Sequence, residues 1–194
     1  MLTSLKEKTL TLNNSTCPWW LCFTFDNPVR RLLHKPEQIL GGLIKPGQTV
    51  ADIGCGMGYF TVPMAKMVGE GGRVIAIDLQ LEMLAALKRR AARQNLQHRI
   101  HYHLAQLERI GLAEPVDFTL TFWMVHEVKD PAAFLAEIKG MLKPDGRFLM
   151  VEPKIHVSRA HFEKTVEIAR TVGLVPVATP EVSISRAVLF APSP

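Results

Sequence analysis

Three alternating glycines and an acidic residue form the most informative motif of this chain. Gly54, Gly56 and Gly58 follow the apolar segment 49–53, within which Asp52 lies just ahead of them. A glycine lacks a Cβ, so it permits a tight turn and lets a ligand approach bare backbone. Parallel α/β sheets bind their ligands at the carboxyl ends of the strands. The motif therefore predicts a site for a small polar ligand.

The glycine spacing narrows the class of ligand. A dinucleotide-binding motif needs glycine at its first, third and sixth positions. Counted from Gly54, the sixth position is Tyr59, whose ring would obstruct the contact between helix and strand. A phosphate-binding P-loop is excluded because no Gly-Lys-Ser/Thr occurs in the chain. Because Tyr59 stands where the dinucleotide-binding motif needs glycine, a nicotinamide-dependent oxidoreductase is disfavoured.

Two further polar residues follow expected strands. The strand predicted over 72–79 ends in Asp78-Leu79, and a carboxylate there can accept two hydrogen bonds from a ribose diol. The strand predicted over 99–104 leads to Gln106, whose amide oxygen could accept from an exocyclic amine. These positions favour a nucleoside-containing ligand.

The motif Asp-x-Gly-x-Gly-x-Gly resembles motif I of the class I S-adenosylmethionine (SAM)-dependent methyltransferases. Segment 134–152 is similar to the helix, Leu-Lys-Pro-x-Gly turn and fifth strand of the same family. The resemblance covers roughly residues 40–190 and implies an α/β, Rossmann-like fold with a doubly wound, mostly parallel seven-stranded sheet. It also implies that the hairpin predicted over 174–178 and 187–191 makes the last strand antiparallel.

The resemblance implies SAM as the cofactor and S-adenosylhomocysteine as the product. The expected cofactor-binding residues are Asp52, Gly54, Cys55, Gly56, Gly58, Asp78, Leu79, Gln106 and Phe122. Ala105-Gln106 departs from the small residue and acid that the family often has near the adenine. Asp52 is expected to act near the methionine end or to orient the turn, and both roles stay open. Cys55 is expected to be a small packing residue rather than a nucleophile.

One strong candidate for a proton acceptor lies beside the expected methyl position. His126 follows the strand predicted over 116–122, and its ordinary pKa suits neutral pH. It is predicted as a general base, and the alternative is a residue that only lines the pocket. Glu127 is expected to be a structural acceptor. Glu152 and His156 are expected either to form a second polar wall or to anchor loops.

The leading prediction is a methyltransferase with a small-molecule acceptor. An RNA or protein methyltransferase comes second, since the chain has Thr121-Phe122-Trp123-Met124 where nitrogen-modifying relatives carry Asn/Asp-Pro-Pro-Tyr. A SAM-binding module without catalysis is third. The arsenite methyltransferases share the core, but they carry further cysteines and a longer carboxyl-terminal region.

The 194 residues suit one domain with a short appendage. We expect a leader over 1–36 and a SAM-binding methyltransferase domain over 37–194. Cysteines and aromatic residues crowd positions 17–25, which predicts a lid, a cover for the sheet or a homodimer interface. Cys17 and Cys22 lack the usual metal-ligand spacing, so no metal site is predicted.

Charge and cysteine usage bound the partners and the compartment. The net charge of +5 is mild, and Lys88, Arg89, Arg90 and Arg93 fall on one face of an expected helix, which disfavours a nucleic-acid partner. No apolar run reaches the roughly 18 residues that span a membrane. The start lacks a secretory signal, and three cysteines form no disulfide framework. We therefore expect a cytoplasmic protein without a membrane partner.

Overall fold

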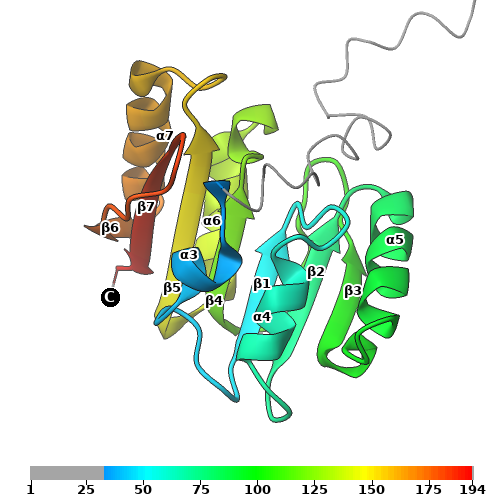
Figure 1. Ribbon diagram of the computed structural model, residues 1–194. Coiled ribbons are helices and arrows are strands. Elements are labelled where there is room, and N and C mark those ends of the chain that lie inside the picture. The colour runs from blue at the N-terminus through cyan, green and yellow to red at the C-terminus, as the bar shows by residue number, and fades with distance from the viewer. Residues whose placement is uncertain (1–32, 194) are drawn as a thin grey trace, which may run out of the picture.

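The computed structural model describes residues 33–193, which contain one seven-stranded sheet. The strands are β1 (Thr49–Ile53), β2 (Arg73–Asp78), β3 (Ile100–Leu104), β4 (Val116–Phe122), β5 (Leu142–Pro153), β6 (Leu174–Ala178) and β7 (Ser185–Pro192). Their order is β3-β2-β1-β4-β5-β7-β6 (Figure 1). Strands β1 to β5 pair in parallel, whereas β7 runs antiparallel between β5 and β6. The predicted fold class, including the antiparallel last strand, is confirmed.

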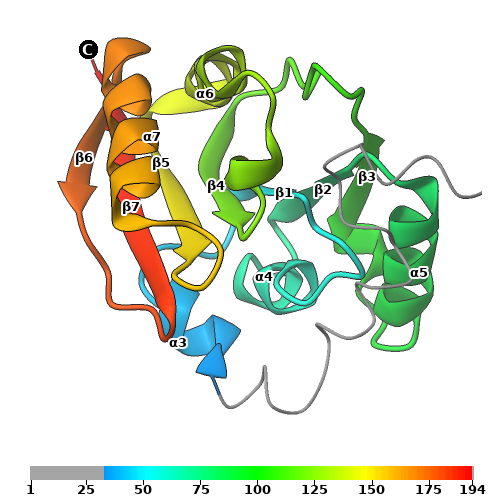
Figure 2. The same cartoon turned by 90° about the horizontal axis from the view of Figure 1, so that it is seen from above.

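Helices cover both faces of the sheet (Figure 2). They are α3 (Pro36–Leu40), α4 (Thr61–Met67), α5 (Leu81–Ala92), α6 (Pro131–Met141) and α7 (Arg159–Thr171), with single 3₁₀ turns at η2 (Gln97–Arg99) and η3 (Val125–Glu127). The first apolar cluster joins one face to α3, α4 and α5, and the second joins the other face to α6 and α7. On β1, Val50 belongs to the first cluster, and Ala51 and Ile53 belong to the second. Burial on both faces explains why apolar side chains of this strand point to either side of the sheet.

Local signals set several helix ends as predicted. Pro36 is the first residue of α3, where its missing N–H costs no helical hydrogen bond. The Ser158 hydroxyl accepts from the His161 N–H at the start of α7. Gly173 follows the end of the same helix with a φ of +86°, a conformation that glycine adopts without a Cβ clash.

Three boundaries differ from the predictions. Helix α3 ends at Leu40 rather than at residue 43, because Gly41 and Gly42 follow and glycine is a poor helix former. The predicted Leu-Lys-Pro-x-Gly turn, residues 142–146, lies inside β5, where the pairing with β4 is irregular. Strand β7 extends beyond 187–191 at both ends, because Ser185 and Arg186 pair with β5 and Pro192 pairs with β6.

The aromatic segment 17–25 lies outside the described residues, so its role as lid, cover or interface stays a prediction. His34, at the end of the predicted leader, is fully buried. Its Nε2 lies 2.9 Å from the Ser183 carbonyl oxygen, and its own carbonyl accepts from the Tyr59 hydroxyl at 2.6 Å. This part of the leader therefore packs on the domain. Within residues 33–193, no helix has the length and apolar character needed to cross a bilayer.

Replacing Gly58 with alanine should destabilise the fold through packing as well as backbone strain. Gly58 has a φ of +84°, and an added Cβ would overlap the buried Leu87 side chain of α5. Gly42 has a φ of +80°, but an added Cβ would meet no atom within 4 Å. Gly42→Ala is thus the matched control for strain alone. We expect Gly58→Ala to lower the free energy of unfolding in urea by about 1–3 kcal/mol more than Gly42→Ala. Equal losses would contradict this packing role.

Candidate active site

The glycine loop after β1 folds over the end of β2. The N–H groups of Gly54 and Cys55 both donate to the Ile77 carbonyl, at 2.9 and 3.1 Å. The Gly58 N–H then donates to the Cys55 carbonyl at 2.9 Å and closes the turn. Backbone hydrogen bonds therefore set the path of the loop.

Asp78, at the end of β2, holds the next part of this loop. One carboxylate oxygen accepts from the Gly56 N–H and the other accepts from the Gln80 N–H, both at 2.9 Å. The residue is only 9% exposed. Burial raises the pKa of Asp78, and the backbone hydrogen bonds oppose that rise. The predicted ribose acceptor and the glycine motif thus form one hydrogen-bonded unit.

The three motif glycines have different surroundings. A Cβ added at Gly54 would lie 3.0 Å from Cγ of Met124, and one added at Gly58 would overlap Leu87. A Cβ added at Gly56 would meet nothing within 4 Å. Gly54 is exposed, Gly56 is half-buried beside Asp78, and Gly58 is buried. Gly56 has free space where a Cβ would stand, whereas a side chain at Gly54 or Gly58 would meet a neighbouring residue.

Asp52 is buried at the end of β1 and accepts from the Thr61 hydroxyl at 2.5 Å. Thr61 is the first residue of α4, so this contact joins the two elements that flank the glycine loop. The geometry supports the turn-orienting role that the sequence left open. Thr61 was not among the predicted site residues, although a hydroxyl at the start of the helix that follows the motif was a usable signal.

An apolar rim surrounds the outer end of the site. Leu79 after β2, Leu104 at the end of β3 and Leu107 are 38%, 52% and 58% exposed. Gln106 is exposed between them, and its backbone exchanges hydrogen bonds with Arg109 at 3.0 and 3.1 Å. The predicted positions Leu79 and Gln106 therefore border the same edge as Asp78.

Two predicted contact residues lie in the packed interior instead. The Phe122 ring is 7% exposed, and its centroid lies 4.4 Å from that of Phe60 and 5.1 Å from that of His34. It shares the helix-covered face of β4 with Phe118 and Leu120, because alternate strand residues point to the same side. We therefore leave Phe122 out of the proposed cofactor contacts.

The Cys55 side chain is buried as well, and its thiol donates to the Gly56 carbonyl at 3.6 Å. Burial first, and then the charges of Asp52 and Asp78, raise the pKa of the thiol well above its usual range. A thiol that resists ionisation is a poor nucleophile. This agrees with the expected packing role.

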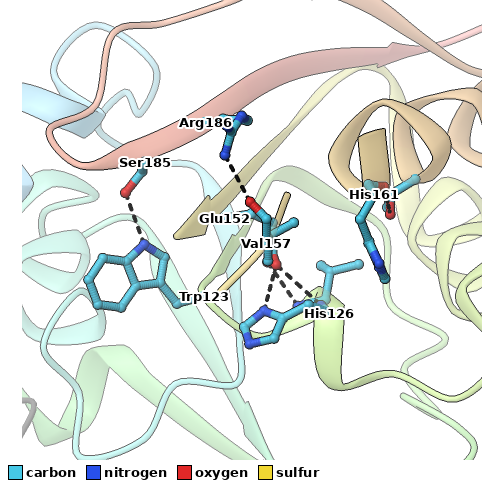
Figure 3. A network of polar contacts seen from close by, with 9 residues as sticks. Trp123, His126, Glu152, Val157, His161, Ser185 and Arg186 are labelled. Carbon is cyan, nitrogen blue, oxygen red and sulfur yellow. Dashed lines mark hydrogen bonds and ion pairs between the residues drawn. The ribbon is translucent and has the colours of Figure 1, made fainter. Parts of the chain in front are cut away.

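His126 and Glu152 meet at the carboxyl ends of β4 and β5 (Figure 3). His126 Nδ1 lies 2.6 Å from Glu152 Oε2. The same carboxylate accepts from the N–H groups of Val125 at 3.0 Å and of His126 at 3.2 Å. The hydrogen bond to Glu152 raises the pKa of His126, burial opposes the rise, and the charges of Glu152 and Glu127 add to it. The site thus contains a paired imidazole and carboxylate.

Both residues of this pair were predicted to be polar groups of the site, but their pairing was not. Glu152 was instead expected beside His156, which is exposed. The pairing could have been predicted from the order of the strands, because polar residues at the carboxyl ends of neighbouring parallel strands lie at the same edge of the sheet. Of the two roles expected for Glu152, the structure supports the loop anchor, because its buried carboxylate accepts from the N–H groups of Val125 and His126.

Trp123 redirects the chain immediately after β4. Its φ is +62°, in the left-handed region that few side chains adopt. Its N–H donates to the Val151 carbonyl at 2.8 Å, and its indole Nε1–H donates to the Ser185 hydroxyl at 2.9 Å (Figure 3). These contacts hold the turn that carries His126 against β5 and β7.

Comparison with known proteins assigns the family. A family model described as "Methyltransferase domain" matches residues 51–150, which is more than half of the chain. The chain belongs to this methyltransferase domain family. The match includes the glycine loop, Asp78 and His126.

Individual relatives and structures agree with this family. A "Ubiquinone biosynthesis O-methyltransferase" of Bradyrhizobium diazoefficiens is 34% identical over 125 residues, covering 64% of this chain and 44% of that protein. A "Demethylmenaquinone methyltransferase" of Lactobacillus johnsonii is 31% identical over 110 residues, covering 56% of this chain and 45% of that protein. The chain thus spans less than half the length of these curated relatives.

A solved SAM-dependent methyltransferase from Aquifex aeolicus superposes with a TM-score of 0.80 at 27% identity. The match covers 90% of this chain and 98% of that one. The class I SAM-dependent methyltransferase resemblance is therefore confirmed.

The methyltransferase-family chain should show a pH-dependent stabilisation from His126. Folding raises the pKa of His126, whereas the unfolded value is about 6.5. The stabilisation is therefore fully present below about pH 6.5 and is lost as the pH rises through the folded pKa. In urea unfolding, wild type should exceed His126→Asn in stability by more at about pH 5.5 than at about pH 8.5. In a Glu152→Gln background, the stability difference between the two pH values should be smaller. A stabilisation by His126 that grew with pH would contradict the raised pKa of His126.

Proposed function

We propose that this chain binds SAM at the carboxyl ends of β1, β2 and β3. We further propose that the methyl group of SAM passes to a small-molecule acceptor and that S-adenosylhomocysteine is released. The observation that carries the proposal is the Asp78 carboxylate bonded to the Gly56 N–H of the glycine motif. This contact brings a ribose acceptor and open backbone together at the strand ends where α/β sheets bind ligands.

The residues at this edge fit the cofactor. Asp78 uses each oxygen for one backbone hydrogen bond, and a carboxylate oxygen has capacity for a further donor such as a ribose hydroxyl. Gly56 leaves open space where a side chain would otherwise stand. The exposed apolar surfaces of Leu79, Leu104 and Leu107 suit the flat faces of an adenine ring.

When bound, SAM supplies an electrophilic methyl group on a positively charged sulfur. The contribution of the chain is alignment, which is worth up to about 7–11 kcal/mol in favourable intramolecular reactions. In our proposal Asp78 and the Gly56 backbone hold the nucleoside end. Asp52 keeps the loop in place through Thr61, and His126 accepts a proton from the acceptor.

A small-molecule acceptor is favoured by the relatives, two of which bear names of quinone-biosynthesis methyltransferases. We extend the proposal to a cytoplasmic location on the basis of the cysteine usage. A homodimer stays a prediction from the aromatic leader.

Asp78→Ala should weaken SAM binding by about 1–3 kcal/mol, because the ribose hydroxyls lose a charged acceptor. Isothermal titration of SAM into the full chain measures the change. Asp117→Ala is the matched control. Asp117 also accepts from a backbone N–H, that of Thr49 at 2.9 Å, but it lies near the opposite ends of the strands. Its removal should leave the SAM affinity of the folded protein unchanged. Equal affinities for wild type and a folded Asp78→Ala would overturn the proposed site, as would binding of NAD in preference to SAM.

His126→Asn should retain SAM affinity but lower the transfer rate at least about tenfold, because asparagine cannot accept a proton near neutral pH. The assay is transfer of labelled methyl from SAM to a pool of metabolites, with an RNA pool alongside. The rising limb of the wild-type pH profile should disappear in the variant. A smaller drop with an intact pH profile would make His126 a residue that only lines the pocket.

A further inference from the structure

We propose that Glu152 is the positioning residue of this site. It holds His126 with Nε2 as the proton acceptor, so the methyl acceptor carries a weakly acidic O–H or N–H that loses its proton on methylation. This inference deepens the proposed function and rests on it. Its evidence is the geometry of one buried carboxylate.

Two backbone N–H groups and one imidazole nitrogen converge on Glu152, which is 2% exposed. Oε1 accepts from the Val125 N–H, Oε2 accepts from the His126 N–H, and Oε2 also lies 2.6 Å from His126 Nδ1. A buried carboxylate is tolerated when such donors offset its desolvation. The two backbone bonds fix the η3 turn, and the ring bond fixes the orientation of the imidazole. Loss of Glu152 would therefore free both the turn and the ring.

The ring bond also decides which nitrogen can accept a proton. Opposite an ionised carboxylate, Nδ1 carries the hydrogen, so the lone pair of the neutral imidazole is on Nε2. Figure 3 shows this second nitrogen pointing away from Glu152. The side chain of His126 is 22% exposed, against 3% for that of Glu152. The proton acceptor thus faces outward while its partner is sealed inside the protein.

Two further charged residues, Glu127 and Arg186, lie near this pair. Glu127 belongs to the same 3₁₀ turn and adds to the negative potential at the ring. Arg186 lies opposite Glu152 on β7, but its guanidinium donates to the Val157 carbonyl at 2.9 Å (Figure 3). Glu152 therefore has the most direct charged contact with His126.

This arrangement suits an acceptor that must lose a proton. The acceptor atom uses a lone pair to form its bond to the methyl carbon, and the carbon–sulfur bond breaks with its electrons going to sulfur. The proton of the acceptor atom moves to Nε2, and water later removes it. A thioether has no such proton, so a positioned imidazole would add nothing to its methylation. We therefore assign the acceptor to groups with an ionisable O–H or N–H, such as phenols, enols and amines.

The test that needs no acceptor is proton–nitrogen NMR of the histidine side chains in the full chain, with His126 assigned through the His126→Asn spectrum. In wild type we expect Nδ1 of the neutral ring to be protonated and the pKa to lie above 6.5. Glu152→Gln should lower that pKa and increase the population protonated at Nε2. Glu127→Gln is the matched control, since it removes a nearby charge without removing the ring hydrogen bond. It should leave the tautomer unchanged and lower the pKa by less.

Either result of the NMR experiment decides whether Glu152 positions His126. An Nε2-protonated ring in wild type, or a tautomer and pKa unchanged in folded Glu152→Gln, would overturn the positioning role. If Glu152→Gln does not fold, the positioning role is tested by the tautomer of His126 in wild type and in Glu152→Asp, a variant that keeps the negative charge. Glu152→Asp should retain the Nδ1-protonated ring and a pKa above that of the unfolded chain.

Transfer assays test the substrate class separately. With methyl-labelled SAM, acceptors with a phenol, enol or amine should be methylated, and the rising limb should move to lower pH in Glu152→Gln. Methylation confined to thioethers would overturn the class. If the wild-type chain does not bind SAM, the proposed function is refuted, but the NMR result on the pairing of Glu152 with His126 still holds. Failure of the proposed function and failure of the positioning role are therefore distinguishable.

Discussion

The position of β1 between β2 and β4 is the constraint on which the whole site depends. All three strands are parallel, so their carboxyl ends meet at one edge of the sheet. The chain continues into α4 on one face after β1 and into α6 on the other face after β4. This reversal leaves room at the edge for the glycine loop and for the turn that carries His126. A Cβ added at Gly56 would meet no atom within 4 Å, so this part of the loop has free space beside its backbone.

Buried carboxylates near the ends of three strands then define the chemistry of that edge. Asp52, Asp78 and Glu152 are each less than 10% exposed, and each accepts hydrogen bonds from a neighbouring loop or helix start. Burying a charge is unfavourable unless donors compensate it. The loops supply these donors and are ordered by the same bonds. Each carboxylate therefore holds a loop or a helix start, and a substitution that removes one of them also releases the segment that it holds.

Local signals explain which elements were predictable. An apolar run bounded by turn residues identifies β1 and β4, and Ser158 and Gly173 mark the ends of α7 because capping is a short-range interaction. The extent of β7 was less predictable, since its added residues pair with β5 at one end and with β6 at the other rather than follow an apolar pattern. The turn over 142–146 became part of β5 for the same reason, because pairing with β4 at Leu142 and again from Arg147 extends the strand.

The sequence by itself determined the glycine loop, Asp78 and the class of cofactor, because these depend on backbone conformations and spacings encoded within about thirty residues. Only the tertiary structure decided that Glu152 pairs with His126 and that Phe122 packs against His34 and Phe60. Those contacts join residues far apart in the chain, and they depend on strand order and on the face to which each side chain points. The physical reason is that local patterns specify the strands, whereas long-range packing selects the neighbours of each strand.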